Sequence, residues 1–504
     1  MLRDRCGLCL NSLTNMQLLT IYILCLASTI AASCIWRSWR LLDNPTIWSF
    51  LRRQFLYTLL CRRLRTSSDI NVLAGINLLV FGAANITACT LWIQNPAELG
   101  KRCGTLFIVN VIPLYLGGRT NFLIDKVFRL QLNEYSLLHR WLGRVCVMQG
   151  LLHGVLSGTM SSLSVAEITL LSLLAALGCL SLLHIRRLIH QKSSRSTTII
   201  TLERLSGPHT TSPGAMKVVF RFESNKSSDL GPGQYVYLTA PGLHRHSLGF
   251  LQSHPYVIAW IESTEPNEKH GESQGGHWSE ITILVERNKG FSDAIFALKR
   301  TSSFLIDGPY GHIQSLDHYD KVLFMASGIG VAAHLLHIRH LLEAHNTKSA
   351  RVRRITLVWF LETSDQERWA KPYLESLQDK DSSNKDGYRI FIYKRYLPSP
   401  QRSRTMDKDN GKRLYEIHDR LDMSKEIEGE GSADGGNIAV SVCGNPHFES
   451  AIRKAVRSSN YDVHLFMHGF RPEETETGRL SRDRYCWKSG FDNETQASHS
   501  NKIG

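Results

Sequence analysis

The distribution of apolar residues divides the chain into two unlike halves. Before residue 190 the sequence contains apolar runs long enough to cross a bilayer as helices, whereas later apolar residues come in short runs. The predicted spans are Gln17–Trp36 and about 70–92, 103–118, 137–157 and 166–185. We therefore expect a multi-pass helical membrane unit followed by a unit of mixed strands and helices.

Positive charge predicts the orientation of these spans. The first run is too long for the core of a signal peptide, and more Lys and Arg follow it than precede it, which is typical of an anchor with its N-terminus outside. Five crossings then leave the second half in the cytosol, where Arg186 and Arg187 follow the last span. Lys101 and Arg102 fit less well, because they stand at the outer end of a span.

The second half changes pattern twice. From about 196 onward the runs MKVVFRF, QYVYLTA, YVIAWI and EITILVE are separated by Gly and Pro, which predicts a small antiparallel barrel. From Lys321 onward, strand-like VLFMA, ITLVWFL and NIAVSVCG alternate with helical patterns, which predicts a parallel sheet with crossover helices. The polar stretches 264–279 and 400–436 are expected to be surface insertions, and 471–504 a polar tail.

Overall composition hides this division. The mean hydropathy of −0.16 averages the two halves, and the net charge of +14 comes from Lys and Arg that cluster where membrane loops are expected. We interpret the charge as a topology signal and expect no nucleic-acid partner. The eleven cysteines imply no disulfide framework, and the isolated pair Cys6 and Cys9 is not expected to bind metal.

Two histidines, His139 and His153, lie in the fourth predicted span. Fourteen positions are about four helical turns, so the two side chains share a face and stand roughly 21 Å apart along the axis. Imidazole is a common axial ligand of heme iron, and ionisable side chains inside a span are rare. This helix predicts one axial ligand for each of two stacked hemes; hydrogen bonding within a helical bundle is the structural alternative.

The segment VLFMASGIGVAAHLL places Gly328 and Gly330 between a strand and a helix. Glycines there let the backbone approach a pyrophosphate, and the helix N-terminus offers unpaired N–H groups to it. A tight strand-to-helix turn without a ligand uses the same residues. Both interpretations stay open on this motif alone.

Further motifs lie in the barrel half. They are His254-Pro255-Tyr256-Val257 at the start of a predicted strand, Arg287 with Gly290, and Gly308-Pro309-Tyr310-Gly311 just before the parallel sheet. Each one is also ordinary turn chemistry. Their order and spacing favour a binding function over turns alone.

As a set, these motifs resemble the fungal ferric reductases of the ferric reductase and NADPH oxidase superfamily. The resemblance covers roughly residues 70–470 and includes RCGTLFIVNVIPLYLGGRTN, LHRWLGRV, SHPYVIAW, DGPYG, ASGIGVAAH and VSVCGNPHF. It implies a multidomain protein with an α-helical transmembrane heme domain. A ferredoxin-reductase-like antiparallel β-barrel FAD domain and an α/β parallel-sheet NADPH domain follow.

The resemblance also implies domain boundaries. They are 1–66 for an N-terminal anchor helix and basic cytosolic linker, 67–192 for a shortened ferric-reductase-like transmembrane domain, 196–315 for the FAD-binding barrel, 316–470 for the NADPH-binding domain and 471–504 for the tail.

The cofactors implied are FAD, NADPH and heme b. The FAD-binding residues expected are His254, Pro255, Tyr256, Val257, Arg287, Gly290, Gly308, Pro309 and Gly311, with Arg287 near the phosphates. The NADPH-binding residues expected are Gly328, Gly330, Cys443 and Gly444. His139 and His153 are the expected ligands of heme iron, and no catalytic residue is singled out.

The activity implied is ferric-chelate reduction. Electrons would pass from cytosolic NADPH through FAD and heme to extracellular Fe(III), in iron uptake. The expected partners are ferric chelates, the lipid bilayer and iron-uptake proteins, and the expected location is the plasma membrane, although a vacuolar membrane satisfies the same topology. The alternatives are a superoxide-forming NADPH oxidase and a heme-deficient, membrane-tethered flavin dehydrogenase.

The sequence departs from the family pattern after the last span. The family carries a second histidine pair there, but SLLHIRR is followed by LIHQKSSRSTT and then by the barrel. His184 and His190 are six residues apart and face different directions on a helix. Either the sequence lacks a segment or the protein lacks two bis-histidine hemes.

Two smaller departures concern the cofactor motifs. Val257 stands where the family has Thr or Ser, which removes a hydroxyl expected near the flavin. The sequence CGNPH at Cys443 to His447 replaces the family's CGPPG, next to the expected nicotinamide site.

Overall fold

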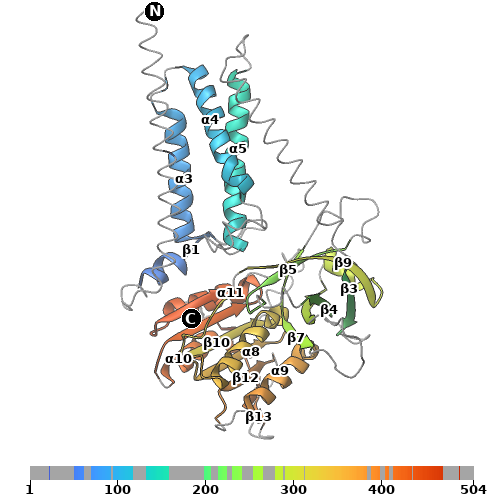
Figure 1. The fold of residues 1–504 in the computed structure, drawn as a ribbon. Helices are drawn as coiled ribbons and strands as arrows, with labels where there is room; N and C mark the ends of the chain where they lie inside the picture. Colours follow the sequence, from blue (N-terminus) through green and yellow to red (C-terminus); the bar gives the residue numbers. More distant parts are fainter. Residues whose placement is uncertain are drawn as a thin grey trace, which may run out of the picture. The chain divides into compact units, whose positions relative to one another are not determined.

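The structure is a computed structural model of the 504-residue chain. It describes Tyr22 and residues 50–61, 70–91, 93, 95–116, 132–157, 198–205, 214–223, 230–240, 254–264, 278–287, 290–311, 313–382, 388–397, 403–407, 413–433, 435–468 and 487–488. The chain divides into two compact units, Met1–Ser194 and Arg195–Gly504 (Figure 1).

Three long helices dominate the described part of the first unit. They are α3 (Val72–Thr90), α4 (Pro96–Leu116) and α5 (Leu132–Ser157), and α4 packs against both others (Figure 1). Helix α4 begins before the predicted span because Pro96 supplies a fixed φ and the Asn95 side chain accepts from Glu98 N at 3.0 Å. The predicted spans Gln17–Trp36 and 166–185 lie outside the described residues, apart from Tyr22.

Short elements precede α3. They are η2 (Arg52–Leu56) and the antiparallel strands β1 (Leu59–Cys61) and β2 (Ile70–Asn71). The Asn71 side chain accepts from Ala74 N at 2.7 Å and so caps α3. Among the described helices, α3 alone passes as a membrane span on length and apolar composition.

A buried cluster of polar side chains joins the three helices to Tyr22. Asn110 donates to Asn85 Oδ1 at 2.8 Å and to Gln149 Oε1 at 3.0 Å, and Gln149 donates to Asn85 Oδ1 at 2.9 Å. The Tyr22 hydroxyl lies 2.6 Å from Asn110 Oδ1. These side chains are at most 4% exposed, so their hydrogen bonds fix the packing of otherwise apolar helices.

The second unit begins with the predicted antiparallel sheet. Its strands are β3 (Thr198–Arg204), β4 (Ala215–Glu223), β5 (Tyr235–Thr239), β6 (His254–Val257), β7 (Trp260–Thr264), β8 (Trp278–Glu286) and β9 (Thr301–Tyr310), with the short helix α7 (Phe291–Phe296). The order is β6-β5-β9-β3-β4-β8-β7, so the half-barrel architecture is confirmed. The predicted insertion at 264–279 lies outside the described residues except at its ends.

The run YVIAWI forms two strands, where the pattern predicts one. Ile258 N donates to Gln234 O at 3.0 Å, and Ala259 N donates to Thr282 O at 2.9 Å. Within two residues, the chain therefore stops pairing with the segment that leads into β5 and begins to pair with β8. Continuous hydrophobicity hid this change of partner, because both sides of the break are buried.

A parallel sheet with crossover helices follows. Its strands are β10 (Lys321–Ser327), β11 (Arg354–Phe360), β12 (Phe391–Tyr396), β13 (Ser403–Asp407), β14 (Leu414–His418), β16 (Ile438–Cys443) and β17 (Val463–Met467), in the order β13-β14-β12-β11-β10-β16-β17. The intervening helices are η6 (Gly328–Val331), α8 (Ala332–Asn346), η7 (Ser364–Gln366), α9 (Glu367–Ser382), α10 (Met423–Ser432) and α11 (Pro446–Ser458). Only β13 runs antiparallel to its neighbour in this sheet.

The expectation of a surface insertion at 400–436 was wrong. Strand β14 pairs in parallel with β12, and α10 packs on the sheet. The short strand β15 (Leu421–Asp422) leads into α10 and pairs with β18 (Trp487–Lys488), which lies in the predicted tail. Composition misled here because acidic residues of α10 are buried against cations of the sheet.

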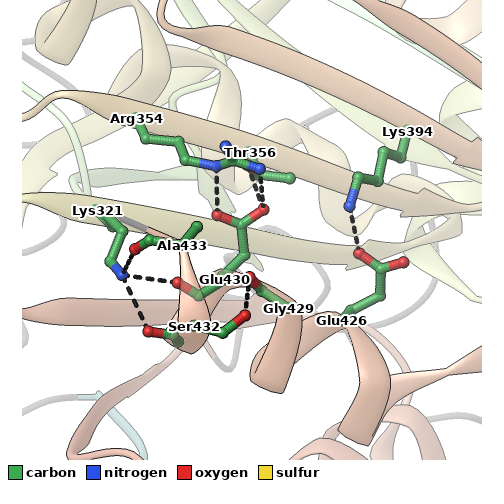
Figure 2. A network of polar contacts seen from close by, with 10 residues as sticks. Lys321, Arg354, Thr356, Lys394, Glu426, Gly429, Glu430, Ser432 and Ala433 are labelled. Carbon is green, nitrogen blue, oxygen red and sulfur yellow. Dashed lines mark hydrogen bonds and ion pairs between the residues drawn. The ribbon is translucent and has the colours of Figure 1, made fainter. Parts of the chain in front are cut away.

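Figure 2 shows these buried ion pairs. Glu430, 3% exposed, accepts from Arg354 Nε at 2.7 Å and Nη2 at 3.2 Å and from Thr356 Oγ1 at 2.9 Å. Lys321 Nζ donates to the Glu430 carbonyl oxygen at 2.7 Å and to Ala433 O. Glu426 accepts from Lys394 at 2.6 Å. The first residues of β10 and β11 are thereby tied to α10.

Replacement of Glu430 with Ala should leave the half-buried Arg354 without its bidentate partner, which is itself 3% exposed. We expect the free energy of unfolding of this domain to fall by about 3–5 kcal/mol. Urea unfolding of the full-length chain, followed by tryptophan fluorescence, measures the change. Glu375→Ala is the control, because its ion pair with Lys371 is exposed and 4.0 Å long and should contribute no more than about 1 kcal/mol. Equal losses would contradict the assigned role.

Three buried histidines, His334, His337 and His468, lie next to Ser441 of β16. His334 and His337 of α8 lie with ring centroids 5.6 and 5.4 Å from that of His468, and Ser441 Oγ is 2.9 Å from His468 Nε2. Burial, then the neighbouring imidazoles, holds the pKa of His334 and His337 well below 6.5. His340 adds to this effect on His337. His334 and His337 are therefore neutral in the folded protein near neutral pH.

These lowered pKa values predict acid sensitivity. Below pH 6.5 these two side chains bind protons in the unfolded chain but not in the folded domain, so stability present above that pH is lost as pH falls. His337→Leu should flatten the fall between pH 6.5 and about 5 in urea unfolding curves. An equally steep fall in the variant would exclude His337 as a source of the acid sensitivity.

Candidate functional site

Two of the predicted binding motifs lie on either side of β5. Tyr235 of β5 is opposite Val257 of β6 on one edge and opposite Tyr310 of β9 on the other. The segments His254–Val257 and Gly308–Gly311 are therefore neighbours of one strand, although the barrel separates them in sequence. The antiparallel sheet thus brings together the residues predicted to hold FAD.

Aromatic contacts order the His-Pro-Tyr motif. The His254 ring stacks on Phe291, the first residue of α7, with centroids 4.2 Å apart and planes inclined by 21°. The ring centroid of Tyr256 lies 6.5 Å from that of Phe291. Burial raises the pKa of the Tyr256 hydroxyl, so it stays protonated near neutral pH and able to donate a hydrogen bond.

Two glycines allow the end of β9 to pack on β5. Gly308 has φ +138° and Gly311 has φ +84°, which an L side chain rarely adopts. A Cβ on Gly308 would lie 3.3 Å from Tyr235 O, and one on Gly311 would lie 3.2 Å from the Tyr235 ring. Packing against Tyr235 is sufficient to require these glycines, and the turn they form carries Pro309.

Arg287 follows β8 and lies beside α7. Its Nε is 2.6 Å from Asp293 Oδ1, and its guanidinium carbon lies 5.5 Å from the Phe296 ring centroid. Gly290, with φ +94°, immediately precedes α7. Arg287 is 55% exposed, so its charge remains accessible to an anion while Asp293 sets its position.

The second site is at the carboxyl edge of the parallel sheet. β10 and β16 are adjacent, with Ala326 opposite Cys443, so the turns that follow them meet. A Cβ on Gly330 would lie 2.1 Å from Cys443 O, which only a glycine avoids. Gly328 has φ +52°. The predicted NADPH residues Gly328, Gly330, Cys443 and Gly444 therefore form one contiguous backbone surface.

Ser327, Trp359 and Asn445, none of them predicted to bind the cofactor, hold this backbone in place. Asn445 N donates to Ser327 Oγ at 3.0 Å, and Trp359 Nε1 donates to Gly328 O at 2.8 Å. The Asn445 side chain also caps α11. Ser327 could have been noticed because it lies between the strand and the first glycine. Trp359 gave no local signal, since it comes from the neighbouring strand β11.

The backbone here suits an anion. Helix η6 and then α8 continue directly from the end of β10, so the positive end of their dipole lies at this edge. No side chain intervenes at Gly328 or Gly330. The same backbone that packs on Cys443 is therefore shaped to approach the pyrophosphate of a dinucleotide.

The two candidate heme ligands lie on α5 in different surroundings. His153 is half-buried, and its Nδ1 lies 2.8 Å from Gly100 O of α4. A Cβ on Gly104 would lie 2.8 Å from the same Nδ1, so Gly104 makes room for the ring. His139 is exposed. His184 and His190 lie outside the described residues.

Two family models match the second unit of the chain. Residues 215–314 match the family described as FAD-binding domain, and residues 319–457 match the family described as ferric reductase NAD binding domain. The first segment contains β5, β6 and β9, and the second contains the turns after β10 and β16.

Curated relatives are fungal reductases of greater length. The probable cell surface ferric reductase kap2 of Aspergillus oryzae is 22% identical over 230 residues, which are 44% of this chain and 29% of that protein. Ferric reductase transmembrane component 3 of Saccharomyces cerevisiae is 28% identical over 112 residues, which are 21% of this chain and 13% of that protein. The matches thus span less than a third of each relative.

A solved flavohemoglobin from Malassezia yamatoensis is 15% identical, with a TM-score of 0.36, and the match covers 79% of this chain and 84% of that one. At that score the superposition adds nothing to the assignment.

The family matches agree with the geometry of the two edges. The chain carries the FAD-binding and NAD-binding domains of the ferric reductases.

Proposed function

We propose that the protein is a membrane ferric-chelate reductase that takes electrons from cytosolic NADPH and delivers them to Fe(III) on the other side of the membrane, in iron uptake. The observation that carries the proposal is the pairing of an FAD-type edge on β5 with a dinucleotide-type edge on β10 and β16 in one unit of the chain. The names of the fungal relatives supply the substrate class.

The residues of each edge have separate tasks. FAD and heme, when bound, convert the two-electron hydride of a nicotinamide into the single electrons that Fe(III) accepts. The Gly328–Gly330 and Cys443–Gly444 turns would bind the dinucleotide through backbone N–H groups. His254, Pro255 and Tyr256 would hold the flavin, with Arg287 near its phosphates.

The first unit supports a membrane location. Large apolar side chains are exposed along α3 and α5, as lipid-facing residues would be. They are Ile76, Leu79, Val80, Ile86, Val147, Met148, Leu151, Leu152 and Val155. We propose a multi-pass protein of the plasma membrane, for which a vacuolar membrane is the alternative with the same topology.

His153 has the hydrogen bond expected of a heme ligand. A carbonyl oxygen accepts only, so Nδ1 must carry the proton toward Gly100 O, and the lone pair is on Nε2. This tautomer, fixed by a backbone acceptor, is the form in which histidine binds iron. His153, and His139 on the same helix, would each hold the iron of a heme b through a ring nitrogen.

A heme-deficient flavin dehydrogenase is the second candidate. In the described part of the first unit, His139 and His153 are the histidines, and both belong to α5. Opposite axial ligands would have to come from elsewhere. In this candidate the cytosolic half oxidises NADPH and the helices only tether it.

The cytosolic half can be tested by dye reduction. Gly330→Ala should raise the KM for NADPH at least tenfold or abolish dye reduction, because its Cβ would collide with Cys443 O. Gly429→Ala is the control, since a Cβ there meets nothing within 4 Å. Assays with NADH beside NADPH test the proposed nucleotide. Normal kinetics in Gly330→Ala would remove this edge as the dinucleotide site.

The membrane half requires a separate test. His153→Ala should abolish the Soret absorbance of the purified chain and Fe(III) reduction across membranes, while NADPH-driven dye reduction persists. Met148→Ala, an exposed change on the same helix, should alter none of these. Superoxide in place of Fe(II) would indicate the oxidase. Dye reduction by a wild-type chain without a Soret band would establish the heme-deficient dehydrogenase instead.

A further inference from the structure

Two cysteines of the first unit face each other across the α3–α4 hairpin. Cys89, next to the last residue of α3, and Cys103, near the start of α4, have their Sγ atoms 3.9 Å apart. Cys103 is fully buried and Cys89 is half-buried. Among the four cysteines whose side chains the structure describes, Cys89, Cys103, Cys146 and Cys443, this is the pair with a sulfur-to-sulfur contact.

The surrounding contacts hold the two helices in register at this point. Asn85, one turn before Cys89, accepts from Asn110 of α4 and from Gln149 of α5. Arg102 donates to Leu91 O, the carbonyl just after α3. The sulfurs need to approach by only about 2 Å to reach the bond length of a disulfide.

The position of the pair in the membrane favours oxidation. In the topology of the proposed function, on which this step rests, the basic segment before α3 is cytosolic, so the end of α3 is at the outer surface. A positive charge at that surface, such as that of Arg102, does not fit the positive-inside pattern. The contact of Arg102 with Leu91 O explains it as a cap of the hairpin and not as a topology signal. Disulfides persist on this side of a cell membrane.

We propose that Cys89 and Cys103 form a disulfide that covalently joins α3 to α4. The oxidant is a protein disulfide of the secretory compartment. The thiolate of half-buried Cys89 attacks that disulfide and displaces one of its sulfurs as a thiolate. The Cys103 thiolate then attacks Cys89 Sγ and displaces the second. One disulfide is exchanged for another, and the two protons lost by the cysteines go to the two thiols released.

The test counts oxidised cysteines in the full-length chain. Membranes are lysed with N-ethylmaleimide present, the chain is purified in detergent, and remaining thiols are blocked under denaturing conditions. Disulfides are then reduced and the new thiols labelled with maleimide-polyethylene glycol. The wild-type chain should gain two more labels than Cys89→Ser or Cys103→Ser. Cys146→Ser, from the buried thiol of α5, is the matched control and should give the wild-type count.

Mass spectrometry of the digested wild-type chain guards against misfolding of the variants. A peptide pair joined through Cys89 and Cys103, lost on reduction, supports the proposal. Free thiols at both positions in the wild-type chain, with equal label counts in all variants, overturn it. Neither readout depends on electron transfer, so a disulfide-linked chain that reduces no Fe(III) would refute the proposed function and leave this inference intact.

Discussion

The α/β domain depends on one strand, β10, which is buried along its whole length and hydrogen-bonded on both edges. Its carboxyl end turns at Gly328, and its amino end begins with Lys321, which is anchored to α10. A parallel strand with both faces covered cannot shift without breaking two ladders. The position of the Gly328 turn, at the carboxyl end of β10, therefore also depends on the charge network at its amino end.

In the barrel, a central antiparallel strand, β5, positions the motifs on its two neighbours. β5 lies between β6 and β9, so two motifs distant in sequence are aligned by hydrogen bonds and not by loop chemistry. Tyr235 is paired with β6 on one edge and with β9 on the other. Glycine is needed at 308 and 311 because a Cβ there would lie within 3.3 Å of Tyr235. Close packing on Tyr235 and the approach of a cofactor both require a residue without a side chain at 308 and 311. The presence of glycine there is therefore explained by packing alone and does not by itself indicate binding.

The helical unit uses polar contacts where hydrophobic burial gives little direction. Asn85, Asn110 and Gln149 specify how the apolar helices α3, α4 and α5 meet, and the His153–Gly100 contact does the same further along α5. Such contacts are directional and have no competing water in an apolar surrounding. The Cys89–Cys103 contact belongs to the same interface.

The sequence alone determined that an FAD-type domain precedes an NAD-type domain, the strands β10, β11 and β16, the turn at Gly328–Gly330 and the family, because periodicity and turn chemistry are local. It did not reveal that Glu430 of α10 is buried and Glu426 half-buried, since the cations that pair with these residues, Arg354 and Lys394, lie on β11 and β12. Nor did scattered cysteines suggest that Cys89 meets Cys103. Only the tertiary structure decided these pairings, because each depends on side chains brought together by packing between elements.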